Sequence, residues 1–228
     1  KRHHREYVSV TGIHRGLRIT VMGTGMGGGC SEIAMVELAQ CVQHATVIRC
    51  GSCGALQPDI ELGDLVVSQG AVRLENTSLA YVEPGYPAVA HPEVALALLQ
   101  AAGKNGAKSH LGLTATAPGF YASQCRKAPG FEMREPDLVD RLARQGIANL
   151  EMEASCVLTM ASLRGFRAGA VCAVYANRPH NTFIEPAARK QAELNCVRTG
   201  LEALHILDAM KTARGADLNW HPGHGLPT

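Results

Sequence analysis

The chain has 228 residues, of which 46% are hydrophobic and 18% charged, a composition typical of one globular α/β domain. Its formal net charge of +2 excludes the strongly basic surface that nucleic acids or anionic membranes attract, and none of its apolar runs is long enough to span a bilayer. No signal peptide is visible, so we expect a cytoplasmic protein with no nucleic-acid or membrane partner.

Short apolar runs alternate with stretches of helical periodicity along the chain. The predicted strands cover residues 17–22, 45–50, 65–72, 110–115, 149–152 and 168–176. The predicted helices cover residues 31–43, 93–104, 136–145, 153–164 and 186–211. This alternation predicts an α/β fold, a single domain with a central mixed β-sheet flanked by helices.

The composition becomes polar after Arg214, where the sequence ends in DLNWHPGHGLPT. We therefore predict a domain over residues 1–214 and a flexible tail over residues 215–228. His221 and His224 in this tail could bind a metal ion, but mobility is the favoured interpretation.

The eight cysteines stand singly, either in apolar runs such as those around Cys41 and Cys50 or in glycine-rich turns. This pattern predicts reduced and mostly buried thiols, as in a cytoplasmic protein. Cys50 and Cys53 form a C-x-x-C motif, but no second pair and no histidine at zinc-ligand spacing accompany it, so a redox or metal role is disfavoured.

A glycine-rich stretch, GTGMGGGC, follows the first predicted strand, and Gly23, Gly25 and Gly28 match the G-x-G-x-x-G spacing of dinucleotide-binding loops. Such a fold also needs an acidic residue about twenty positions later to hold the ribose. The next predicted strand, ATVIRC, has Arg49 as its only charged residue. A nicotinamide or flavin cofactor is therefore not expected.

The residues after Arg49, GSCGALQ, form a second predicted glycine-rich turn that contains Ser52. Peptide N–H groups, a hydroxyl and a guanidinium together suit a small compact anion such as phosphate. The alternative is that both glycine loops are only tight turns between strands and helices.

Two further stretches carry polar groups in apolar surroundings. In NLEMEAS, Glu151 and Glu153 flank Met152 at a strand-to-helix junction, where a carboxylate can accept bonds from sugar hydroxyls, although exposure to solvent is the usual fate of glutamate. In GFYASQCRKAPGF, Gln124 and Arg126 can face one edge of a flat heterocycle if the chain there is extended.

Four stretches, taken together, resemble the nucleoside phosphorylase superfamily and most closely its bacterial uridine phosphorylases. They are GTGMGGGCSEIAMVELAQ, VIRCGSCGALQPDIELGDLVVSQGAVRLENTS, GFYASQCR and NLEMEASCVLTMASLRGFRAGAVCAVYANR. The resemblance runs from about Arg5 to about Gly200. It implies reversible phosphorolysis of uridine to uracil and ribose 1-phosphate, in pyrimidine salvage, with inorganic phosphate as co-substrate and no other cofactor.

On the phosphate side, the resemblance implies that Arg49 and Ser52 hold the phosphate, with Gly25 shaping the floor of the site. Arg5 matches an arginine that reaches into the site of the neighbouring subunit. The implied assembly is a homohexamer built from dimers that share their active sites.

On the nucleoside side, the resemblance implies that Glu153 accepts the ribose hydroxyls, with Met152 under the sugar and Glu151 alongside. Phe120 would stack on the base, and Gln124 and Arg126 would read the uracil edge, Gln124 fixing its orientation and Arg126 stabilising its negative charge. The implied catalytic residues are Arg126, Gln124 and Arg49.

Arg178 completes the implied nucleoside side by bracing the loop that carries these base-binding residues. Purine-specific relatives have an aspartate after the corresponding strand, whereas Asn177-Arg178 stands here, which favours a pyrimidine.

The chain departs from the family in two respects. The family begins one strand earlier, with a Gly-Asp-Pro-x-Arg phosphate loop preceded by a histidine. The first strand is thus expected to be missing, and His3 and His4 are interpreted as a frayed terminus. Relatives also hold a monovalent cation such as K⁺ between subunits through a glutamate, here Glu6, and a serine, whose place Cys30 takes.

These departures leave two alternatives to an active uridine phosphorylase. One is a truncated, catalytically impaired nucleoside-binding homologue. The other is a purine nucleoside phosphorylase.

Overall fold

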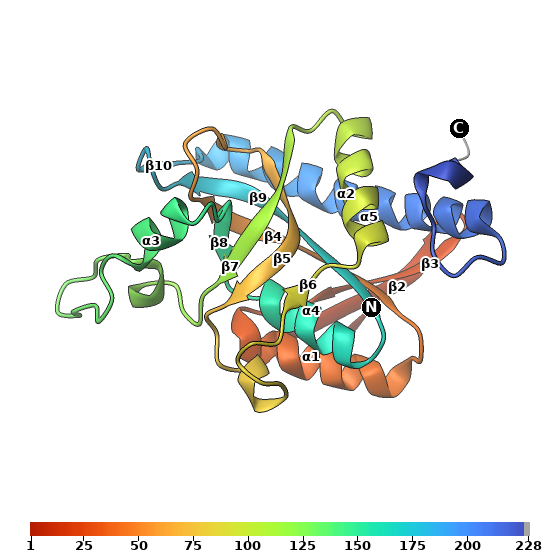
Figure 1. Ribbon diagram of the computed structural model, residues 1–228, viewed down its shortest axis with the longest axis horizontal. Coiled ribbons are helices and arrows are strands. Elements are labelled where there is room, and N and C mark those ends of the chain that lie inside the picture. The colour runs from red at the N-terminus through yellow and green to blue at the C-terminus, as the bar shows by residue number, and fades with distance from the viewer. Residues whose placement is uncertain (226–228) are drawn as a thin grey trace.

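Strands and helices alternate in the computed structural model as the sequence predicts, and the structure describes residues 1–225 (Figure 1). The strands are β1 (Arg2–His4), β2 (Tyr7–His14), β3 (Leu17–Gly23), β4 (Thr46–Ala55), β5 (Leu65–Arg73), β6 (Ala88–Val89), β7 (Ser109–Thr116), β8 (Asn149–Glu151), β9 (Arg167–Asn177) and β10 (Thr182–Phe183). The helices are α1 (Gly27–Cys41), α2 (Pro92–Lys104), α3 (Leu138–Arg144), α4 (Ala154–Leu163) and α5 (Pro186–Arg214), with 3₁₀ turns η1 (Ser78–Ala80), η2 (Ala122–Gln124) and η3 (Pro222–His224).

The main sheet has seven strands in the order β10-β9-β4-β8-β7-β5-β6, and β9 also pairs with β5. The strands β4, β9, β5, β7 and β8 therefore close into a ring. Parallel pairs (β4 with β9, β5 with β7, β7 with β8) are mixed with antiparallel ones (β4 with β8, β5 with β9). The predicted α/β fold with a mixed sheet is confirmed. A separate antiparallel sheet joins β1, β2 and β3.

Helices cover both outer faces of this sheet (Figure 1). The long α5 packs with α2 on one face, and α1 packs with α4 on the other. The α2–α5 layer buries side chains such as Leu65, Leu98 and Val171, which are fully inaccessible to water. Removing buried groups of this size costs about 2–5 kcal/mol each, so this layer contributes much of the fold's stability.

The predicted glycine-rich turn after Arg49 is wrong, because the residues from Gly51 to Ala55 continue β4. They remain paired with β9, from Gly51 opposite Cys172 to Ala55 opposite Asn177, with one shift of register between Cys53 and Gly54. The glycines serve close approach of neighbouring side chains rather than a change of chain direction.

The N-terminal residues are also more ordered than the sequence predicts. The interpretation of His3 and His4 as a frayed terminus is wrong, since they pair with Val8 and Tyr7 in a hairpin of β1 and β2. A run of polar residues such as RHH lacks the apolar alternation that predicts a strand. Pairing with β2 is what orders these residues.

The described part of the predicted flexible tail folds back over α2. Trp220 packs against the hydrophobic core, and its backbone N–H donates to Glu93 Oε1 at 3.0 Å. Residues 226–228 lie outside the described residues. Whether the segment moves in solution stays a prediction.

All eight cysteines are free thiols, as predicted, but they differ in exposure. Cys53, Cys156 and Cys172 are buried, whereas Cys41 and Cys50 are exposed, contrary to their placement in apolar runs. Burial, followed by the nearby Glu75 carboxylate, raises the pKa of Cys156 to about 12, which makes it inert as a nucleophile.

No helix within residues 1–225 combines the length and the apolar character that crossing a membrane requires.

Candidate active site

Arg49, on β4, is the centre of a largely buried cluster of charged side chains. Its side chain is 12% exposed, and its NH1 group donates to Cys172 Sγ at 2.9 Å on the neighbouring β9. Its NH2 group lies 3.0 Å from Glu151 Oε2 and also hydrogen-bonds Glu153. Burial alone would lower the pKa of Arg49, but Cys172, Glu151 and Glu153 together raise it well above its usual value. The guanidinium is therefore permanently charged and fixed in orientation.

Gly51 makes room for this guanidinium. A Cβ atom added at Gly51 would lie 2.1 Å from Arg49 NH1 and 2.7 Å from its Cζ atom. A side chain at this position would therefore displace the guanidinium toward solvent. The glycine is required for close approach, as is common where a strand passes beneath a functional group.

We expect Gly51→Ala to raise the KM for phosphate by about tenfold or more, because the displaced guanidinium loses its charge-assisted bonds. Steady-state kinetics at varied phosphate concentration measures this effect. Gly103→Ala is the matched control, because Gly103 is exposed in α2 and nothing lies within 4 Å of an added Cβ. An unchanged KM for phosphate in Gly51→Ala would contradict the placement of phosphate at Arg49.

Glu151 and Glu153 reach Arg49 from the junction between β8 and α4. Glu151 is 3% exposed, and its Oε1 accepts from Thr116 Oγ1 at 2.5 Å. Its Oε2 accepts from the backbone N–H groups of Glu153 and Ala154, both at 2.8 Å, and so satisfies the first turn of α4. Glu151 is thereby held within the scaffold with its side chain 1% exposed, whereas Glu153 stands at the N-cap position with its side chain 13% exposed.

The glycine loop meets this cluster through Glu153. The N–H of Gly27, the first residue of α1, donates to Glu153 Oε1 at 2.5 Å. Gly25 and Gly27 have φ angles of 78° and 87°, in the left-handed region that favours glycine. The loop thus brings the positive N-terminal end of α1 and the Arg49 guanidinium to the same carboxylate, that of Glu153. Donors and positive charge gathered in this way make an anion-binding arrangement.

Arg126 lies in a second group of residues, on the segment between β7 and α3. Its Cζ atom is 4.4 Å from the centre of the Phe120 ring and 5.8 Å from the Phe183 ring. Its Nε atom is buried without a hydrogen-bond partner in the described chain. Burial and then the positive charge of Arg178 lower the pKa of Arg126.

Arg178 lies directly after β9 and holds the same segment, its NH2 donating to the Cys125 carbonyl at 3.4 Å. Its NH1 atom is also buried without a partner among residues 1–225, and burial lowers its pKa. No carboxylate within residues 1–225 forms an ion pair with Arg126 or Arg178. Two adjacent cations without a carboxylate favour an anionic or electron-rich ligand.

Gln124 and Arg126 do not lie on the extended chain that their spacing suggests. Gln124 ends the 3₁₀ turn η2 and is 4% exposed, and Cys125 between the two residues has φ of 51°. A left-handed residue reverses the local chain direction, so alternation along a strand does not apply here.

The segments that carry Glu151 and Arg126 leave the sheet where β7 and β8 end. These strands are parallel, with Thr116 opposite Glu151, so the segments that follow them leave the same edge of the sheet. The Ala117 N–H donates to the Glu151 carbonyl at 2.8 Å, which fixes the start of the segment carrying Phe120 and Arg126 beside the carboxylates.

The remaining predicted site residues form no side-chain hydrogen bond with the Arg49 cluster within residues 1–225. Ser52 is exposed on β4, and Met152 is half-buried between the two glutamates. Arg5 is exposed in the turn between β1 and β2, with a left-handed φ of 53°. Their roles stay predictions.

The environment of Glu6 fits a monovalent cation poorly. Glu6 Oε1 lies 4.0 Å from Cys30 Sγ, and a Cβ at Gly25 would contact both side chains. Hard monovalent and alkaline-earth cations prefer oxygen ligands, and a thiol is a soft donor. The residues present therefore do not support a cation here, and no step of the reaction is assigned to one.

Three functional contacts were not predicted from the sequence: Cys172 and Thr116, which hold Arg49 and Glu151, and Phe183, which faces Arg126. Phe183 carried a usable signal, because it is a lone aromatic residue in the polar stretch RPHNTFIEP. Cys172 and Thr116 sit in ordinary apolar strands, and only strand pairing reveals their contacts.

The chain resembles known proteins over most of its length. The profile of the Phosphorylase superfamily matches residues 1–209. A uridine phosphorylase of Thermococcus kodakarensis is 46% identical over 96% of this chain and 79% of its own length. A uridine phosphorylase of Klebsiella aerogenes is 36% identical over 90% of this chain and 81% of its own length.

A guanosine phosphorylase of Halorubrum lacusprofundi is also 36% identical, but over 76% of this chain and 67% of its own length. The uridine phosphorylases thus resemble this chain over a longer stretch, and one of them at higher identity. Both the resemblance noted in the sequence and the extent of these matches lead to one conclusion: the chain belongs to the phosphorylase superfamily.

Proposed function

We propose that this chain is a uridine phosphorylase, which cleaves uridine with inorganic phosphate to give uracil and ribose 1-phosphate. In this reaction the bond between C1′ of the ribose and N1 of uracil breaks, and a phosphate oxygen bonds C1′. The observation that carries the proposal is the cluster in which Arg49, the N-terminus of α1 and Glu153 meet. In this cluster, the groups that would donate hydrogen bonds to phosphate directly contact the carboxylate that would accept bonds from the ribose hydroxyls.

The phosphate would bind between Arg49 and the glycine loop, with Ser52 supplying a hydroxyl. Arg49 is already matched by two carboxylates, so these three side chains together carry a net negative charge. A phosphate at this point needs further positive charge. We propose that Arg5 of a neighbouring subunit provides it, which makes the active site shared within a dimer and the working assembly a homo-oligomer.

The ribose would bind over Met152, with its hydroxyls donating to Glu153. Both glutamates accept bonds from the protein through both oxygens, but the Glu153 side chain is 13% exposed and that of Glu151 only 1%, so Glu153 is the one that a ribose can reach. As the ribose hydroxyls take over the Glu153 oxygens, the Arg49 guanidinium becomes freer to hold phosphate. Glu151 keeps the guanidinium in place meanwhile.

The base would lie against Phe120, beneath Arg126 and Arg178. When the glycosidic bond breaks, its electron pair stays on uracil, and the leaving base carries negative charge until water protonates it. Two guanidinium groups that pair with no carboxylate within residues 1–225, each with a buried N–H group lacking a partner there, are suited to stabilise that charge as it develops. Gln124 would fix the orientation of the base through its amide. The attacking group is phosphate itself, so no side-chain nucleophile is needed.

Asn177 favours a pyrimidine over a purine. Its Nδ2 donates to the Ile60 carbonyl at 2.9 Å, and its Oδ1 accepts from the His180 N–H at 2.9 Å. The side chain is thus part of the scaffold and cannot titrate, so it offers no proton to the imidazole ring of a leaving purine.

The test is phosphate-dependent release of uracil from uridine by the purified chain, followed by ultraviolet absorbance, with ribose 1-phosphate detected by ³¹P NMR. We expect product only when phosphate is present, and faster cleavage of uridine than of inosine or guanosine. Faster purine cleavage would overturn the substrate assignment. Absence of any phosphorolysis would overturn the enzymatic assignment.

A further inference from the structure

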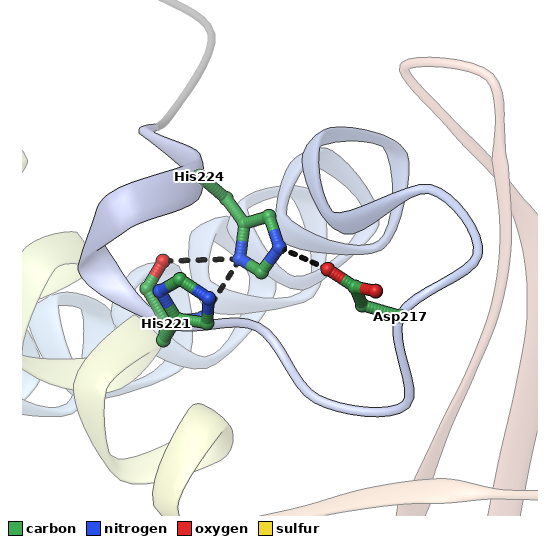
Figure 2. Close-up of side chains that lie close together, drawn as sticks. All are labelled: Asp217, His221 and His224. Carbon is green, nitrogen blue, oxygen red and sulfur yellow. Dashed lines mark hydrogen bonds and ion pairs between the residues drawn. The ribbon is translucent and has the colours of Figure 1, made fainter.

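Asp217, His221 and His224 gather their side chains at one point beyond the end of α5, apart from the residues assigned to the active site (Figure 2). One potential ligand atom from each residue lies within 4.8 Å of the other two. His224 Nε2 is 2.7 Å from Asp217 Oδ2. Within residues 1–225 this is the one group of three or more such side chains that meets this spacing.

The local backbone holds the two imidazole rings in place. The His221 N–H donates to His224 Nδ1 at 3.1 Å, and the Gly223 N–H donates to His221 Nδ1 at 3.1 Å, so the rings cap the short η3 turn. A Cβ at Gly223 would lie 2.8 Å from the His221 ring. The HPGH turn therefore requires glycine to keep His221 over it.

Trp220 anchors the same segment to the domain. Its indole packs on the core and donates to the Gly225 carbonyl at 2.9 Å, while its backbone N–H donates to Glu93. Glu93 is 3% exposed and also pairs with Arg167 and Arg214. Trp220 thus fixes the chain to the core between Asp217, which precedes it, and His221 and His224, which follow it.

We propose that Asp217, His221 and His224 form a binding site for a divalent transition metal ion, with Zn²⁺ as the best match. Two imidazoles and one carboxylate are the ligands that Zn²⁺ commonly takes, with a solvent molecule in the fourth position. Zn²⁺ would replace the proton between His224 Nε2 and Asp217. The neutral His224 ring would then carry its proton on Nδ1, directed at the His221 carbonyl 3.3 Å away, in place of the bond that Nδ1 accepts from the His221 N–H.

The distances require only small side-chain movement. Tetrahedral bonds of about 2.0–2.1 Å place ligand atoms about 3.4 Å apart, against separations of at most 4.8 Å here. His221 would exchange its bond from the Gly223 N–H for the metal, or turn its other nitrogen toward it. We expect metal binding to link the residues before Trp220 to those after it and so to hold this segment against the core.

Zn²⁺ titration by calorimetry tests the site, with Cu²⁺ quenching of Trp220 as a local reporter, because Trp220 is the chain's single tryptophan. We expect one Zn²⁺ per chain and strong quenching. Asp217→Asn, His221→Ala and His224→Ala should each weaken Zn²⁺ binding at least about tenfold. Gly223→Ala retains all three ligands but displaces the His221 ring, and should also weaken it.

His205→Ala and His44→Ala are the controls, because His205 contacts only one further histidine, His14, and His44 is exposed between α1 and β4. Both should bind Zn²⁺ as the unaltered chain does. Equal binding by the Asp217, His221 and His224 variants, or loss confined to His205→Ala, would overturn the proposal. So would absence of Zn²⁺ binding to the unaltered chain.

Discussion

Replacing Arg126 with alanine is expected to lower kcat for uridine phosphorolysis by about 10²–10³, the usual effect of removing a donor to developing negative charge. Phosphate affinity should stay nearly intact, because Arg126 belongs to the group around Phe120 rather than to the Arg49 cluster. Initial rates at varied uridine and phosphate concentrations measure both effects. The variant should fold, since it removes a cation that pairs with no carboxylate among the described residues 1–225 and relieves repulsion from Arg178.

Two comparisons separate charge stabilisation from mere packing against Phe120. Arg126→Lys keeps a positive charge but loses the planar fork, so it should recover part of the rate. 5-Fluorouridine, whose base is a more stable anion, should show a smaller loss than uridine in Arg126→Ala. Equal losses of uridine turnover and phosphate affinity would contradict the assignment of Arg126 to the base.

Replacing Arg49 with alanine is expected to do the reverse and raise the KM for phosphate steeply, by about 10² or more. The guanidinium is the charged donor at the centre of the proposed phosphate position. The substitution also leaves Glu151 and Glu153 facing each other unpaired, and removing one partner of a buried ion pair costs about 3–5 kcal/mol. Kinetics and thermal unfolding should therefore be measured on the same preparation.

Arg49→Lys separates these two effects. A lysine ammonium keeps the charge between the glutamates and so should recover most of the unfolding free energy, but it cannot contact Cys172, Glu151 and Glu153 in the same planar geometry. The KM for phosphate should remain raised in this variant. An Arg49→Lys enzyme with ordinary phosphate dependence would show that Arg49 acts only through folding.

The resemblance in the sequence led to most of the residues of the candidate site, and the structure changed how several of them are held. Glu151 is implied to lie alongside the ribose, which stays a prediction, and the structure adds that both of its oxygens are held by α4 and Thr116. Gln124 and Arg126 can face one edge of the base only if the chain between them is extended, and a left-handed Cys125 separates them instead. In each case hydrogen bonds to a distant segment, or a single backbone angle, override the local pattern.

The sequence by itself determined the local features: the alternation of strands and helices, a glycine loop at the start of α1, and charged residues in otherwise apolar runs at 49, 151 and 153. These follow from side-chain periodicity and backbone freedom, which act between residues close in the chain. Only the tertiary structure decided that the residues after Arg49 remain in β4, that Cys172 and Thr116 hold the polar cluster, and that Asp217 joins His221 and His224. The first two depend on strand register in a closed ring, and the third on how Trp220 packs, so all three are set by burial between segments far apart in the chain.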